Sequence, residues 1–454
     1  MSLFLYTLFQ IHPKSTKVLD TAVMGNYWNV KKKKKIFKGN CSQNMESSDE
    51  ITVELMQEIM REVEKDNTLT VLPSLLVDEL NKELHGGSCL SRVTVNFSRG
   101  EDKSQQTISL IVKVLPNIAV MSEAVRNSSM FPREIQMFDE ILPRMSNLLK
   151  SALAGDHTEF FARVYYTRKS PNFLIAIEDL APKGFKAQKR KYGLDLKHCQ
   201  LAFKMIARFH AASVVINRRD KDLLAVFDKY SFTEEALKKP MTEIASRVWL
   251  ALYKLVESWD DFGPSWSNRL RKCCEKMQEN LLTLWTRDDA AFNVLDHGDF
   301  GVHNTMFRYS ESGEVEAVML VDIQCCSYNS PVLDLIQFLF SSASEEVKTN
   351  HIDVLLQEYH AELVSTLESL GATDLHIISL SQLVQEFESK MLMGLFYTVT
   401  FLPLLSLDSD SGFTAEDFFK IGTDAFDMSI SLFPVNYVKA LKRLLPIFGE
   451  KNLL

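Results

Sequence analysis

The sequence predicts an α+β protein with two lobes, a small β-rich lobe followed by a larger, mostly helical one. Before residue 180, several short stretches alternate apolar and polar residues, as half-buried strands do. After residue 194, apolar residues mostly recur at three- and four-residue spacing, as helices require. The predicted divisions are a disordered basic extension over 1–45, a first lobe over 46–180 and a second lobe over 181–454.

In the first lobe, a helix is expected to begin at a capping box over 47–50 and to run to about Glu64. Strands over 93–97 and 107–115 are expected to form a hairpin, with Lys113 on the second strand and apolar residues on the opposite face. A further helix is predicted over 132–142 and is expected to end near Pro143. Two more strands are predicted over 160–166 and 173–178.

The second lobe is expected to start with a helix over 194–216, followed by helical patterns to 289. Stretches 302–309 and 315–322 flank turn-forming residues and predict a hairpin. The chain after Pro331 is again helical in pattern. Its most apolar run, 391–407, has 17 residues, fewer than the ~20 that span a bilayer. We therefore expect a buried helix there and no transmembrane segment.

Charge is distributed unevenly over the 454 residues. Residues 1–45 contain eight lysines, five of them consecutive at 31–35, and one aspartate. This basic run predicts either a disordered tail upstream of a start at Met45 or a nuclear-localisation or anionic-lipid patch. The remainder has a net charge of -15, which argues against a nucleic-acid partner. Seven cysteines without a CxxC pair predict reduced thiols and a cytoplasmic protein.

The most specific motif is His297-Gly298-Asp299 followed by Asn304, five residues after the aspartate. Asp322 ends the partner strand of the same predicted hairpin, so the hairpin brings Asp299, Asn304 and Asp322 to one edge. Two oxygen ligands, Asn304 and Asp322, suit a hard cation such as Mg²⁺. The remaining carboxylate can accept or orient a hydroxyl proton. In-line phosphoryl transfer needs this equipment, because positioning and metal charge do most of its catalysis.

This loop resembles that of the aminoglycoside and choline kinases, relatives of the protein-kinase fold. More closely, the chain resembles the ecdysteroid kinase-like family, also called CHK kinase-like, over about residues 50–445. The matching segments are 111–116, 133–143, 177–180, 207–213, 295–304, 321–324 and 330–335. The resemblance implies a bilobal protein kinase-like fold. It also implies an ATP- and Mg²⁺-dependent kinase that transfers the γ-phosphate to a hydroxyl of a small molecule.

For the nucleotide-binding lobe, the resemblance implies that Lys113 contacts the α- and β-phosphates and that Glu134 pairs with Lys113. It implies that Glu178, Asp179 and Leu180 link the lobes, with backbone groups that meet the adenine edge. The turn 86–88 is a weaker candidate for covering the phosphates.

For the catalytic lobe, the resemblance implies that Asp299 orients or deprotonates the acceptor hydroxyl and that Asn304 and Asp322 hold Mg²⁺. His210 and His297 are expected to be structural, because hydrogen-bonded scaffold histidines are common.

Three departures from the family pattern stand out. Phe300-Gly301 and His303 replace a bulky aliphatic–Trp pair and an Asn, and Ile323 replaces Phe. None of them removes an acid or a metal ligand, so activity remains the expectation. Loop packing, and substrate choice with it, is expected to differ.

The acceptor implied by the resemblance is an alcohol, with ecdysteroids as the named precedent, so hormone inactivation and detoxification are equally compatible. Aromatic residues of the helical lobe suit an apolar acceptor or simply form core: Trp249, Trp259, Phe262, Trp266 and 396–401. The alternatives are a catalytically silent protein that binds hydrophobic metabolites and a choline- or ethanolamine-type kinase. A protein kinase is disfavoured, because no Ala-Pro-Glu segment follows Asp322.

Overall fold

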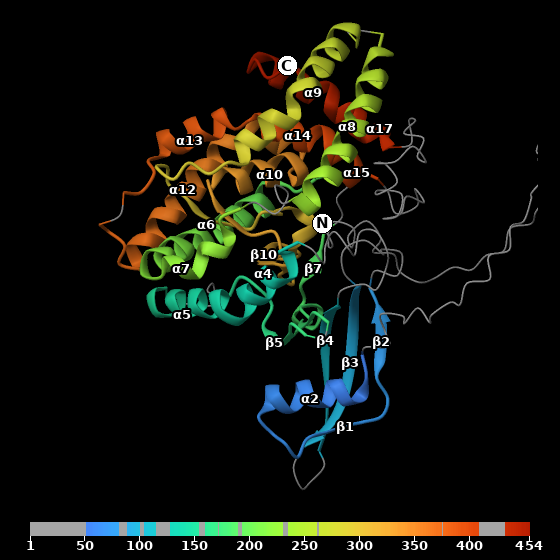
Figure 1. Ribbon diagram of the computed structural model, residues 1–454, viewed down its shortest axis with the longest axis vertical. Helices are drawn as coiled ribbons and strands as arrows, with labels where there is room; N and C mark the ends of the chain where they lie inside the picture. The colour runs from blue at the N-terminus through green and yellow to red at the C-terminus, as the bar shows by residue number, and fades with distance from the viewer. Residues whose placement is uncertain are drawn as a thin grey trace, which may run out of the picture.

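The structure is a computed structural model that describes residues 51–80, 89–99, 104–114, 128–153, 159–170, 172–188, 193–229, 235–260, 263–374, 376–407 and 432–454. The predicted extension over 1–45, the capping box over 47–50 and the turn 86–88 lie outside these ranges. Figure 1 shows two lobes, a small one built on an antiparallel sheet and a larger, mostly helical one. The predicted α+β, bilobal architecture is confirmed.

The predicted hairpin forms the centre of the small lobe's sheet. β3 (Cys89–Arg99) pairs with β4 (Ser104–Val114), and Lys113 lies on β4 opposite Leu90. β1 (Thr70–Val71) and β2 (Leu76–Glu79) lie beside β3, and β6 (Leu174–Glu178) lies between β4 and β5 (Val164–Arg168). β5 begins four residues later than predicted. The cause is that the Phe160 carbonyl leaves the sheet and accepts a hydrogen bond from Leu320 N of the large lobe.

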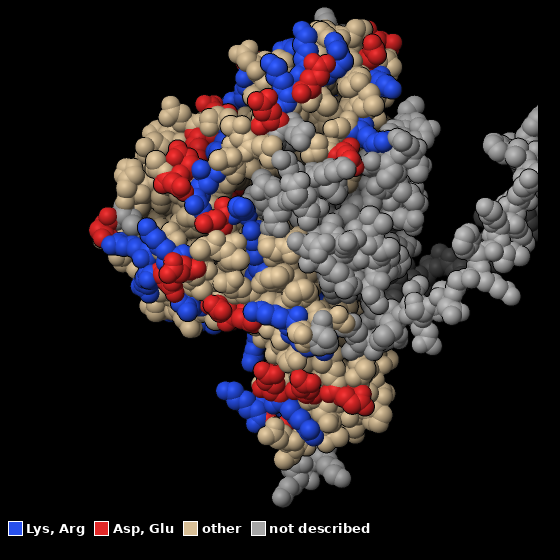
Figure 2. Space-filling model, viewed as in Figure 1, with Lys and Arg blue, Asp and Glu red and all other residues tan. Residues whose placement is uncertain are grey.

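One face of this sheet is covered by α2 (Val53–Glu64). Four buried residues of α2 pack against alternate residues of β3 and β4: Leu55, Met56, Ile59 and Met60 against Val93, Val95, Leu110 and Val112. The helix begins later than predicted, because Thr52 is its N-cap and the Thr52 hydroxyl accepts from Leu55 N. Glutamates on its solvent face form the acidic row across the lower lobe in Figure 2.

The helix that carries Glu134 is longer than predicted. α4 (Met130–Gln136), a π-helical turn (Met137–Ile141) and α5 (Leu142–Ala152) form one continuous run, so the prediction that it ends near Pro143 is wrong. A proline lacks an amide hydrogen and its ring collides with the carbonyl four residues back. The π-helical turn immediately before Pro143 changes this spacing, because Leu142 N bonds to Met137 O, and the helix resumes.

The large lobe is organised around α6 (Leu196–Arg219), which packs against α12 (Ile352–Ser369). Among the described helices, α6 alone has the length and apolar composition to cross a membrane, and most of that stretch is buried inside the protein. The apolar run 391–407, predicted as one buried helix, is buried but forms two helices that meet at Phe401, with Pro403 in the first turn of the second. The remaining helices are α7 (Lys221–Leu224), α8 (Glu235–Glu257), α9 (Gly263–Trp285), α10 (Val332–Ser342), α11 (Glu345–Asn350), α13 (Leu380–Ser389), α14 (Leu392–Thr400), α15 (Leu402–Leu405) and α17 (Val435–Glu450), with a 3₁₀ turn at Ala225–Phe227.

Two small sheets hold the HGD loop, defined here as residues 297–304. β8 (Val294–Asp296) pairs with β11 (Ser327–Asn329) and enters the loop. β9 (Thr305–Tyr309) leaves it, pairing with β10 (Val315–Leu320) on one side and β7 (Lys186–Ala187) on the other. The predicted hairpin forms, but with shorter strands. Its first strand starts at Thr305, because Val302–Asn304 forms a 3₁₀ turn. Its second strand ends at Leu320, so the prediction that Asp322 ends this strand is wrong: Asp322 lies two residues beyond it, where its φ of 63° leaves the extended conformation.

Candidate active site

Lys113 joins two carboxylates that come from distant parts of the chain. Its Nζ lies 2.6 Å from Glu134 Oε2 and 2.8 Å from Asp322 Oδ1. All three side chains are buried, with at most 5% of the surface of each residue exposed. The contact between Lys113 and Glu134 is the one expected from sequence. Asp322 and the nearby Gln324, whose Oε1 is 3.4 Å from Nζ, are further neighbours that the sequence did not predict for Lys113.

One cation between two buried carboxylates cannot fully compensate both. Burial raises the pKa of Glu134 to about 7, and Asp322 opposes the lowering effect of Lys113. Burial also disfavours the charged form of Asp322, but the adjacent Lys113 outweighs it and holds the pKa of Asp322 below its usual value. Burial lowers the pKa of Lys113, yet the two carboxylates together shift it above its usual value. The two carboxylates are therefore shifted in opposite directions, Asp322 toward the ionised form and Glu134 toward the protonated form.

The backbone turns sharply at Asp322. Its φ of 63° lies in the left-handed region, which is uncommon for a residue other than glycine. The segment before it is tied to the HGD loop, because Val321 N donates to Asn304 O at 3.0 Å and His297 Nε2 donates to Val321 O at 3.1 Å. These bonds fix the position of Asp322 relative to the loop that carries Asp299.

Asp299 is held by three side-chain donors. Its Oδ1 accepts from His303 Nε2 at 3.2 Å and from Gln337 Nε2 at 3.0 Å. Its Oδ2 accepts from Asn304 Nδ2 at 3.0 Å. Two of the donors come from the HGD loop and the third from α10, so the carboxylate is fixed in one orientation.

Asn304 presents a suitable oxygen for a cation. Its amide nitrogen is used by Asp299, while its Oδ1 is buried and has no hydrogen-bond partner among the described residues. A buried carbonyl oxygen without a donor is costly unless a ligand satisfies it. Together with the carboxylate of Asp322, it gives the oxygen donor set that Mg²⁺ prefers, so the residues present fit this ion.

Beneath the HGD loop, Asp334 of α10 anchors the backbone. Its carboxylate accepts from His297 N at 2.7 Å and from Gly298 N at 3.0 Å. Gly298 has a φ of 74° and lies against the backbone of Cys325, so a side chain at this position would collide with Cys325. These contacts hold the backbone of the loop directly before Asp299.

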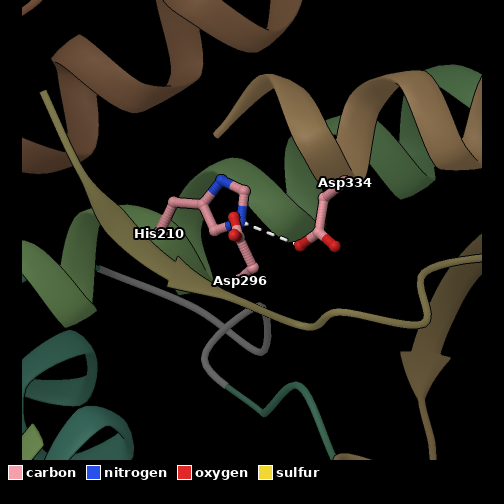
Figure 3. A group of neighbouring side chains, drawn as sticks. All are labelled: His210, Asp296 and Asp334. Atoms are coloured by element: carbon pink, nitrogen blue, oxygen red, sulfur yellow. Dashed lines mark hydrogen bonds and ion pairs between the residues drawn. The ribbon is translucent and has the colours of Figure 1, made fainter. Parts of the chain in front are cut away.

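Figure 3 shows that His210 and Asp296 lie beside Asp334. His210 Nε2 donates to Asp334 at 3.2 Å, and its Nδ1 accepts from Tyr359 Oη at 2.8 Å, an arrangement that suits a neutral ring. Burial lowers the pKa of His210 and raises that of Asp296 well above its usual value. Because hydrogen bonds already use both nitrogens of His210 and both oxygens of Asp334, this cluster is a scaffold. His210 and His297, the two histidines expected to be structural, both have hydrogen-bonded rings: His210 within this cluster, and His297 outside it, through Val321 O and Asp299 N.

A cleft between the lobes contains the other predicted residues. Asp179 connects the sheet to the segment that enters the large lobe: its carboxylate accepts from Arg92 Nε and Ser109 Oγ, each at 2.7 Å, and from Ala181 N at 3.1 Å. The 3₁₀ turn Ala181–Lys183 follows. The cleft is mostly apolar and also contains charged side chains. Its lining comprises Leu80, Leu90, Arg92, Ile111, Lys113, Glu134, Phe138, Phe161, Ala162, Ile175, Ile177, Glu178, Asp179, Leu180, Met306, Leu320, Val321 and Asp322.

The structure thus brings Lys113, Glu134 and Asp322 into contact, and Asp299 into contact with Asn304. Sequence reasoning missed Gln337, which lies three residues after Asp334 and hence on the same helix face. The described aromatic residues that were considered for the acceptor lie in the core of the large lobe or pack against it. Trp249 is 1% exposed and donates to Thr400, which makes it a core residue. Trp259 and Trp266 pack against the large-lobe core, and Phe262 lies outside the described residues.

The family of this chain follows from a match between its sequence and a family model. The model of the ecdysteroid kinase-like family matches residues 85–372, more than half of the chain. The chain therefore belongs to the ecdysteroid kinase-like family, a family of small-molecule phosphotransferases. A search of curated proteins found no match.

Solved kinase structures are similar to this chain at a low level. One is an amicoumacin kinase in complex with AMP-PNP, Ca²⁺ and amicoumacin, at 14% identity over 80% of this chain and 91% of that chain, with a TM-score of 0.35. Another is the choline kinase LicA from Streptococcus pneumoniae, at 15% identity over 75% of this chain and 99% of that chain, with a TM-score of 0.30. A third is a choline/ethanolamine kinase family protein from Mesorhizobium loti, at 12% identity over 70% and 88%, with a TM-score of 0.29. The fold described above rests on the chain's own lobes and not on these similarities.

Proposed function

We propose that this protein is an ATP- and Mg²⁺-dependent kinase that phosphorylates a hydroxyl of a small, largely hydrophobic alcohol, such as an ecdysteroid, a related steroid or a xenobiotic. The observation that carries the proposal is the convergence in the cleft. Lys113, Glu134 and Asp322 meet there, and the HGD loop bearing Asp299 and Asn304 is bonded to the same segment. Phosphoryl transfer requires this combination of fixed cation, metal ligands and base.

On the nucleotide side, the apolar lining of the cleft accepts the adenine ring, and Glu178 to Leu180 offer backbone groups at its edge. Lys113 receives the α- and β-phosphates, and Glu134 keeps the lysine side chain pointed into the cleft. Asp179 holds the segment between the lobes in place through Arg92 and Ser109.

On the acceptor side, Asp299 orients the hydroxyl and accepts its proton as the new bond to phosphorus forms. Its donors keep the carboxylate fixed, so little reorganisation is needed at that moment. Asn304 and Asp322 would hold Mg²⁺, whose charge neutralises the phosphate oxygens when it is bound.

The family favours a hydrophobic acceptor over choline. Trp249, one of the aromatic residues considered for the acceptor, is buried core, so the apolar acceptor rests on family membership. A choline- or ethanolamine-type kinase and a silent metabolite-binding protein are the alternatives. We propose a cytoplasmic location and no nucleic-acid partner, on the basis of the acidic body and the cysteine pattern.

Phosphate transfer from ATP to candidate alcohols tests the proposal. We expect transfer to an ecdysteroid or a similar lipophilic alcohol, with kcat/KM for choline at least about tenfold lower, a difference of about 1.4 kcal/mol. A competition assay with both acceptors at equal concentration decides between them. Consumption of choline first would reject the hydrophobic acceptor and leave a kinase, whereas no nucleotide-dependent transfer to any tested acceptor would favour the silent protein.

A further inference from the structure

Two departures of the HGD loop from the family pattern, Gly301 and His303, are spatially coupled. A Cβ built on Gly301 would lie 2.5 Å from His303 Cε1 and 2.8 Å from His303 Nδ1. The imidazole ring therefore occupies the space that any side chain at position 301 would need. The φ of Gly301 is -166°, an extended conformation that any residue adopts. Glycine at this position thus provides room for the ring and not backbone freedom.

The imidazole ring of His303 contacts Asp299. His303 is 3% exposed, and its Nε2 donates to Asp299 Oδ1 at 3.2 Å. Gln337 donates to the same oxygen from α10, at 3.0 Å. His303 and Gln337 together therefore hold Oδ1 of the carboxylate in place. Asn304, the donor on Oδ2, comes from the same loop as His303.

We propose that His303 is a positioning residue for phosphoryl transfer, which holds Oδ1 of Asp299 so that Oδ2 meets the acceptor hydroxyl, and that Gly301 is small in order to admit the His303 ring. The proposal rests on the proposed function, because it requires Asp299 to meet the acceptor. It requires no change in the charge of His303. The two substitutions in the family pattern then form one functional unit.

The first test separates the hydrogen bond from packing. His303→Gln keeps a nitrogen donor near the position of Nε2, whereas His303→Leu fills similar space without a donor. Loss of a hydrogen bond to a charged group predicts a fall in kcat of roughly tenfold to a hundredfold for His303→Leu, with KM for ATP unchanged. We expect His303→Gln to retain kcat within about threefold of the wild type. Equal losses in the two variants would overturn the positioning role.

The second test addresses the coupling between the two positions. Gly301→Ala should lower kcat, because the methyl group displaces the ring, but it should have little further effect in a His303→Ala background. Additive losses would show that position 301 acts without His303, for example through Ser342, whose Oγ would lie 3.2 Å from the new Cβ. Affinity for AMP-PNP with Mg²⁺ should be unchanged in all variants, which excludes misfolding as the cause.

The assays use ATP with an ecdysteroid as the acceptor, and intrinsic ATP hydrolysis as a second readout. If the wild type transfers phosphate, Asp299→Asn does not, and the His303 variants behave as the wild type, then the inference fails while the proposed function stands. If neither the wild type nor any variant consumes ATP, the proposed function fails and the inference fails with it.

Discussion

Two buried polar clusters flank the HGD loop, and they are neutralised in different ways. The first, Lys113 with Glu134 and Asp322, has a cation between two carboxylates and lies at the cleft between the lobes. The second, His210 with Asp296 and Asp334, contains no permanent cation and lies within the large lobe. In the first cluster a lysine supplies the compensating charge. In the second, backbone amides donate to Asp334, and burial raises the pKa of Asp296 well above its usual value.

This difference distinguishes the candidate active site, which contains the first cluster, from the scaffold that supports it, which contains the second. Under the proposed function, the contacts of the first cluster are exchanged: Lys113 turns to the phosphates and Asp322 to a metal ion. The contacts of the second cluster are not, because Asp334 holds the backbone of His297 and Gly298. Substitutions in the first cluster should therefore lower activity at nearly constant stability, whereas substitutions in the second should lower stability.

The largest effect is expected for Asp322→Asn. Loss of this charge removes a metal ligand and the ionised partner of Lys113, so kcat should fall by about a thousandfold, or about 4 kcal/mol. Asparagine tolerates the left-handed conformation of position 322, so the thermal midpoint should change little. Steady-state kinetics and a melting curve measure the two quantities. Undiminished kcat would reject Asp322 as a metal ligand.

Asp334→Asn tests the scaffold. The amide leaves one of the two backbone donors, His297 N or Gly298 N, without a charged acceptor, and we expect a loss of about 3 kcal/mol in the free energy of unfolding. Urea denaturation of this variant should be compared with Asp353→Asn, the same chemical change at an exposed residue in the first turn of α12. Equal midpoints for the two variants would show that Asp334 does not hold the loop.

A smaller, pH-dependent effect is expected for Asp296→Asn. Burial raises the pKa of Asp296 in the folded state, so the folded protein binds one more proton than the unfolded chain above the pKa of an exposed aspartate. Stability of the wild type should therefore fall, relative to the Asn variant, as pH rises above about 4. Urea unfolding at a series of pH values above about 4 should show the free energy of unfolding of the wild type falling relative to that of the variant. A gap independent of pH would mean that Asp296 ionises normally.

The smallest effect is expected from deletion of residues 1–44, which show no apolar periodicity typical of a core. Thermal midpoint and turnover should both stay within error of the full chain. A large change in either quantity would show that residues 1–44 pack on the two lobes.

The lobes and the central hairpin were predicted from sequence because they depend on local periodicity, and the contact between Lys113 and Glu134 was predicted from the family resemblance. Pro143 was misjudged, because a π-helical turn accommodates it and apolar periodicity does not reveal such a turn. The Asp299–Gln337 bond joins residues from two elements, and local periodicity does not reveal such contacts. The sequence also marked Gly301 and His303 as departures, but only the structure shows that one makes room for the other.

The most direct test of the proposed chemistry compares the wild type with Asp299→Asn in transfer of labelled γ-phosphate from ATP to an ecdysteroid. Because Asp299 contacts its neighbours in the HGD loop and α10 and not Lys113, nucleotide affinity should be equal in the two proteins. We predict transfer by the wild type and a loss of at least about a thousandfold in the variant. Equal transfer by both proteins would contradict the assignment of Asp299 as the residue that meets the acceptor hydroxyl.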